Sequence, residues 1–106
     1  SIKKAHNDNF SDSFARIECH YFINNIFLEK NYILKNITKI KNIPVSIVQG
    51  RYDIVCPMRS AWDLKKSMPS FKLYVIDNAG HSMKEIGITN KLIELTNGLA
   101  NCSLNL

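Results

Sequence analysis

The sequence has few cysteines, glycines and prolines and no long apolar run. Its three cysteines, Cys19, Cys56 and Cys102, form no C-x-x-C pair and are odd in number, which argues against a disulfide scaffold and favours a reducing compartment such as the cytoplasm. No apolar run reaches the roughly 18 residues of a membrane-spanning helix. Only four glycines and three prolines occur among 106 residues, and no segment is of low complexity. We therefore expect a globular protein that does not enter the membrane.

Charge is present but not concentrated. The formal net charge is +5, yet the lysines stand singly or in pairs and no basic run occurs. Hydrophobic residues make up 45% of the sequence and charged residues 22%, close to the averages of folded proteins. The lysines fit the solvated faces of helices, so no nucleic-acid partner is expected.

The first part of the chain predicts helices. Residues 1–14 have little periodicity and predict a loop or a frayed helical entry. Residues 14–28 are densely apolar, which predicts a helix buried on more than one side. Residues 33–41 place apolar side chains at steps of three and four with lysines between them, which predicts an amphipathic helix ending before Pro44.

From Val45 the pattern changes to alternating strands and helices. Residues 45–50 are a short β-branched run that predicts a buried strand, and residues 71–76 predict a second strand. Residues 57–68 predict a helix between them. A last helix is expected to be capped by Thr89. Two strands joined by a helical crossover are parallel. The sequence therefore predicts an α/β fold with one βαβα unit, and a sheet of two parallel strands is expected to gain further strands from elsewhere.

Asp53 and His81 each follow a predicted strand. In a parallel sheet the loops after the strands meet at one edge, so the two side chains are expected to lie close together. A carboxylate that accepts one ring N–H of a histidine fixes its tautomer and stabilises the imidazolium formed when the other nitrogen takes a proton. The alternative is that Asp53 only forms a turn and that His81 is an ordinary loop histidine.

Three sequence motifs distinguish between these interpretations. They are Ile-Pro-Val-Ser-Ile-Val-Gln-Gly-Arg-Tyr-Asp-Ile-Val-Cys-Pro (43–57), Ala-Gly-His-Ser (79–82) and Ala-Arg-Ile-Glu-Cys-His-Tyr-Phe (15–22). Together they resemble the proline iminopeptidases, a family of α/β-hydrolases, in the same order and with similar gaps. The resemblance implies that residues 43–106 form the C-terminal βαβα part of a hydrolase sheet. It also implies that residues 1–42 are the helical end of a cap domain.

The resemblance also implies roles for single residues. Asp53 matches the acid and His81 the base of a catalytic triad, and Glu18 matches the residue that binds the free α-amino group of the substrate. Cys56 matches a cysteine near the cleft, for which we expect a half-buried position and no nucleophilic role. The alternative for Glu18 is an ordinary carboxylate on a helix surface, and Cys19 stands where the family has asparagine.

The nucleophilic serine is missing from this pattern. No G-x-S-x-G elbow occurs among the 106 residues, and the oxyanion-hole loop is likewise absent. We therefore expect both to lie in a preceding part of the same enzyme, which the chain needs as its partner, and we expect the chain alone to be inactive. An open sheet edge also predicts self-association of the isolated chain.

The function implied is that of a serine exopeptidase. Such an enzyme releases N-terminal proline from a peptide or an amino-acid amide through an acyl-enzyme, and it needs no metal and no cofactor. Two alternatives stay open. One is another α/β-hydrolase, such as an esterase or epoxide hydrolase, in which Glu18 has no role. The other is a non-catalytic interaction module in which both loops are vestigial.

Overall fold

The computed structural model describes the backbone of residues 8–103, and the chain divides into two compact units. The first unit is Ser1–Ile33 and the second is Leu34–Leu106. Of the loop or frayed helical entry predicted at residues 1–14, residues 1–7 lie outside the described residues, whereas residues 8–14 belong to a regular helix. Among the helices of the described part, none is long and apolar enough to cross a membrane.

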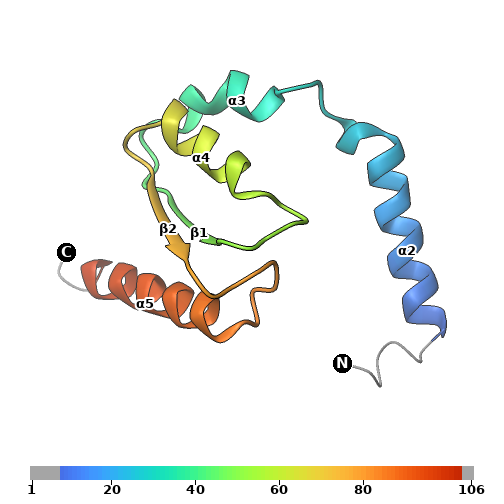
Figure 1. The fold of residues 1–106 in the computed structure, drawn as a ribbon. Coiled ribbons are helices and arrows are strands. Elements are labelled where there is room, and N and C mark those ends of the chain that lie inside the picture. Colours follow the sequence, from blue (N-terminus) through green and yellow to red (C-terminus); the bar gives the residue numbers. More distant parts are fainter. Residues whose placement is uncertain (1–7, 104–106) are drawn as a thin grey trace. The chain divides into compact units, whose positions relative to one another are not determined.

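The first unit consists of helix α2, Asp8–Ile23, and the short 3₁₀ helix η1, Asn25–Phe27 (Figure 1). The prediction of a helix reaching residue 28 is wrong, because α2 ends five residues earlier. Asn24 donates its side-chain amide to the carbonyl of His20 at 2.8 Å, which satisfies a carbonyl of the last turn. Asn25 adopts a positive φ of 51°, a conformation that asparagine tolerates better than most residues. The two asparagines end the helix although apolar residues continue beyond them.

The side chains of this unit are exposed throughout residues 9–33. Phe14 and Phe22 are 54% and 66% exposed, so the predicted burial on more than one side is absent from the chain by itself. The rings of Tyr21 and Phe27 meet edge to face with centroids 5.6 Å apart, an arrangement typical of aromatic pairs. The short η1 segment is too small to cover the remaining apolar side chains.

The second unit is built on two parallel strands, β1 (Ser46–Gly50) and β2 (Lys72–Ile76). Their register pairs Ser46 with Lys72 and Gly50 with Ile76, so both strands end at the same edge of the sheet. Helix α4, Met58–Ser67, connects them and contacts both. Figure 1 shows α4 and α5 flanking the strand pair. The predicted strands and their parallel pairing are confirmed to within one residue. The predicted burial is not, because most residues of β1 and all but the first of β2 are only half-buried.

The predicted amphipathic helix at residues 33–41 forms as two short pieces. These are α3, Tyr32–Asn36, and the 3₁₀ helix η2, Ile37–Ile40, and both end before Pro44 as predicted. Ile37 is 5% exposed and belongs to a small core in the second unit. The buried hydrophobic residues of the described chain are Ile37, Ala61, Phe71, Ala79 and Ile88.

The last helix, α5, spans Ile86–Ser103 and contacts β1. Thr89 does not cap it, because the helix begins three residues earlier. The Thr89 hydroxyl instead donates to the carbonyl of Met83 at 2.7 Å. Gly87 lies against the end of β2, where a Cβ would come within 2.7 Å of Ile76 Cγ2. The lack of a side chain at Gly87 therefore allows the start of α5 to approach the sheet closely.

Candidate active site

Asp53 is held by the turn that follows β1. Its backbone N–H donates to the carbonyl of Gly50 at 3.4 Å, a long contact that closes a tight turn directly after the strand. One carboxylate oxygen, Oδ1, accepts the backbone N–H of Cys56 at 2.8 Å. The side chain is only 7% exposed. The local backbone therefore fixes the direction in which the carboxylate points.

The electrostatic surroundings of Asp53 favour its ionised form. The N–H of Cys56 is the largest influence that lowers the pKa of Asp53 below its usual value. Loss of solvation opposes this shift, while the hydrogen bond and the charge interaction with His81 support it. Asp53 is thus an acceptor at neutral pH.

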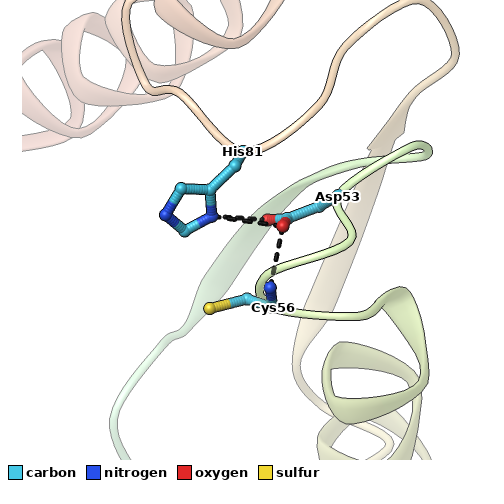
Figure 2. Close-up of side chains that lie close together, drawn as sticks. All are labelled: Asp53, Cys56 and His81. Carbon is cyan, nitrogen blue, oxygen red and sulfur yellow. Dashed lines mark hydrogen bonds and ion pairs between the residues drawn. The ribbon is translucent and has the colours of Figure 1, made fainter.

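His81 meets Asp53 from the loop after β2. Its ring atom Nδ1 lies 3.1 Å from both carboxylate oxygens. Figure 2 shows the imidazole of His81 facing the carboxylate of Asp53. An ionised carboxylate has no hydrogen to donate, so the proton of this contact is assigned to Nδ1 of His81. In the neutral imidazole, Nε2 then carries the lone pair. The side chain of His81 is 55% exposed. This geometry leaves a proton acceptor available to a group outside the pair.

The two loops approach each other closely at their glycines. A Cβ on Gly50 would come within 2.0 Å of the carbonyl oxygen of Gly80 and within 2.7 Å of that of Ala79. The N–H of Tyr52 donates to the same Ala79 carbonyl at 3.0 Å, which joins the two loops directly. Only glycine at position 50 permits this backbone contact. The contact between Asp53 and His81 therefore depends on the packing of the loops behind it.

Two supporting side chains were missed by reasoning from the sequence. Gln49, in β1, has its amide nitrogen 3.4 Å from Oδ2 of Asp53 and 3.0 Å from the carbonyl of Cys56. Glu85, directly before α5, accepts the backbone N–H groups of Gly80 and Ser82. A polar residue directly after the apolar Ile47 and Val48 of the strand was the available signal for Gln49. No sequence pattern marked Glu85, because its partners are backbone groups.

Cys56 lies beside the pair but is exposed, so the predicted half-buried position is wrong. Its backbone N–H has to reach the carboxylate of Asp53, which leaves the thiol outside the packed turn. Asp53, Cys56 and His81 each offer one ligand atom, and these atoms lie within 4.8 Å of one another. A soft metal ion could use the three, but it would compete with the hydrogen bonds that hold Asp53 and His81 together.

Glu18 lies on α2, in the first unit, with an exposed side chain. Its role in binding an amino group stays a prediction, as do the catalytic roles of Asp53 and His81. The geometry of the second unit supports one specific chemical capability. A carboxylate holds an imidazole in one tautomer, and the other ring nitrogen can take a proton from a nucleophile.

Comparison with known proteins agrees with the resemblance to the proline iminopeptidases. A probable proline iminopeptidase of Leptolyngbya boryana is 57% identical over 90 residues, which are 84% of this chain and 28% of that protein. A proline iminopeptidase of Arabidopsis thaliana is 49% identical over 94 residues, 88% of this chain and 25% of that protein. One of Xylella fastidiosa is 48% identical over 85 residues, 79% of this chain and 27% of that protein. No protein-family model matches the chain.

The chain thus spans about a quarter of the length of these relatives and matches their C-terminal end. The parallel strand pair with its helices fits the C-terminal part of an α/β-hydrolase. These relatives are about four times as long as the segments that match this chain.

Proposed function

Because this chain corresponds in sequence to the C-terminal end of the proline iminopeptidases, we propose that it supplies the acid and the base of a serine exopeptidase. The complete protein would release an N-terminal proline from a peptide or an amino-acid amide. The observation that supports this most directly is the contact of His81 Nδ1 with both carboxylate oxygens of Asp53. A serine in another part of the polypeptide would be the nucleophile.

In this mechanism His81 acts twice. Its Nε2 takes the proton of the serine hydroxyl as the oxygen attacks the carbonyl carbon of the N-terminal residue. It then gives that proton to the departing amine when the C–N bond breaks, and the acyl group stays on the serine. A water molecule, deprotonated by the same nitrogen, then attacks the ester carbonyl. Nε2 returns this proton to the serine oxygen as the C–O bond breaks, which frees the amino acid and restores the serine hydroxyl. Asp53 keeps Nδ1 protonated and stabilises the imidazolium at both stages.

We assign substrate recognition to Glu18 on the basis of the resemblance. A carboxylate beside the protonated α-amino group of the substrate forms a charge-assisted hydrogen bond. A peptide whose amine is acylated carries no such charge and leaves that carboxylate without a partner. The enzyme would therefore act only on free N-termini.

The proposal is tested with the full-length protein and three substrates. Proline p-nitroanilide should be hydrolysed, whereas N-acetylproline p-nitroanilide and a simple ester such as p-nitrophenyl butyrate should be poor substrates. Preferred turnover of the ester would indicate another α/β-hydrolase. No turnover of any of them by a folded full-length protein would favour the interaction module.

A matched experiment concerns the chain alone. The 106-residue chain contains no G-x-S-x-G elbow, so we expect it to be inactive on proline p-nitroanilide. Mixing it with a separately produced preceding part of the same protein should restore turnover if the two assemble. Turnover by the isolated chain would contradict the requirement for a serine outside it.

A further inference from the structure

We propose that Glu85 is a positioning residue that clamps the loop of His81 so that Nδ1 faces Asp53. Its two carboxylate oxygens accept the two backbone N–H groups on either side of the histidine. Oε2 accepts from Gly80 at 2.9 Å and Oε1 accepts from Ser82 at 3.1 Å. The catalytic consequence of this clamp rests on the proposed function, whereas the orientation of the imidazole does not.

The clamp fixes the backbone at the point where it controls the histidine. The N–H of Gly80 and the N–H of Ser82 bracket the Cα of His81, so holding both restricts the backbone rotations that aim the ring. Glu85 also donates its own N–H to the carbonyl of Ser82 at 3.0 Å. Three hydrogen bonds thus join one residue to the tripeptide that contains His81.

Glu85 is itself anchored to the rigid part of the second unit. It directly precedes α5, and its carbonyl accepts the N–H of Thr89 at 2.9 Å. Two residues further on, Gly87 packs against Ile76 at the end of β2. A negative side chain is favourable at the start of a helix, where backbone N–H groups give a partial positive charge. The first turn of α5, which packs on the sheet, therefore fixes the position of the His81 loop through Glu85.

The chemistry of the clamp requires a carboxylate with this reach. Both backbone partners are donors, so the side chain must offer two acceptor oxygens in the same plane. Glutamine offers one acceptor, and its NH₂ would face the second N–H. Aspartate keeps both acceptors but is shorter by one methylene. Glu85 is half-buried, so a lost hydrogen bond is only partly replaced by water.

The test uses the full-length protein with Glu85→Gln, and Glu94→Gln, within α5, as the matched control. Glu94 is 65% exposed and pairs only with Lys91 among the contacts in the described chain, so its loss should leave His81 undisturbed. The direct readout is the tautomer of neutral His81, taken from its ring ¹⁵N shifts. We expect Glu85→Gln to lower the Nδ1–H population and to speed hydrogen exchange at Gly80 and Ser82. Glu94→Gln should change neither.

The kinetic readout separates positioning from a general folding defect. On proline p-nitroanilide, kcat should fall by about 10- to 100-fold in Glu85→Gln with KM nearly unchanged, as misplacing a catalytic group by about an ångström can do. Glu85→Asp should recover part of both the tautomer and kcat, because it restores two acceptors. This variant also serves if Glu85→Gln fails to fold.

Unchanged His81 ring shifts and unchanged kcat in a folded Glu85→Gln protein would overturn the inference. The same holds if Glu85→Asp, tested in its place, matches the wild type in both. A tautomer shift in a protein without activity on proline substrates would support the clamp and refute the proposed function. Normal turnover by the wild type, together with Glu85 variants that match it in kcat and in the His81 ring shifts, would support the proposed function and refute the clamp.

Discussion

Nδ1 of His81 lies 3.1 Å from both carboxylate oxygens of Asp53, although 28 positions separate the two residues in the sequence. The contact follows from the parallel register, which pairs Gly50 with Ile76 and so ends both strands at one edge. It also needs a glycine at position 50, because the carbonyl of Gly80 occupies the place of a Cβ. Strand pairing and loop packing together produce the pair.

The first prediction concerns the pH dependence of stability. Asp53→Asn should lower the free energy of unfolding at pH 7, because the N–H of Cys56, and then His81, hold the pKa of Asp53 below its unfolded value of about 3.9. This stabilisation is complete above that value and is lost as the pH falls through the lower folded pKa. Urea unfolding should show the wild type and variant converging below about pH 4. A difference that stays constant down to pH 2 would contradict the assignment.

The second prediction uses two glycines with opposite surroundings. Gly50→Ala places a Cβ within 2.0 Å of a backbone oxygen, so the loops must separate. We expect a loss of about 1 to 3 kcal/mol in the free energy of unfolding, typical of overpacking, and loss of the contact between Asp53 and His81. Gly98→Ala, within α5, meets no atom within 4 Å and should stabilise the protein by about 0.5 to 1 kcal/mol. Chemical denaturation of both variants checks this, and equal stability of the two would refute it.

Much of the fold of the second unit could be predicted from the sequence. The strands expected at 45–50 and 71–76 form as Ser46–Gly50 and Lys72–Ile76, because short runs rich in β-branched or aromatic residues between turns favour strands. The ends of the helices were harder to predict from the sequence. Apolar density suggested that α2 continued to residue 28, but Asn24 and Asn25 end it through local hydrogen bonding and a positive φ. Such local backbone effects outweigh hydrophobic pattern at helix ends.

The site was predictable to a different extent for each residue. The close approach of Asp53 and His81 could be predicted because each lies in the loop after a strand, where parallel sheets collect reactive side chains. Their catalytic roles were implied only by the resemblance to the proline iminopeptidases. The half-buried position expected for Cys56 was wrong, because its backbone rather than its side chain serves the turn. Glu85 could not be found, since it binds N–H groups that every residue except proline possesses. Support of this kind is visible only in three dimensions.

The third prediction concerns recognition of the substrate's amino group. In the full-length protein, Glu18→Gln should reduce kcat/KM for free-amine substrates by an amount equivalent to about 2 to 5 kcal/mol, the cost of leaving one partner of a desolvated charge pair unpaired. N-acetylated substrates should remain poor for both forms, so the gap between free and blocked substrates narrows. Glu29→Gln, another exposed carboxylate of the first unit, is the matched control. Unchanged free-amine turnover in folded Glu18→Gln would remove Glu18 from the site.

The most direct test of the central claim is kcat for proline p-nitroanilide in full-length Asp53→Asn and His81→Ala proteins. If Asp53 orients His81 as acid and base of a serine exopeptidase, each substitution should lower kcat by about 10⁴-fold, the precedent set by serine proteases, while circular dichroism shows an intact fold. Nearly wild-type rates in both folded variants would contradict the claim.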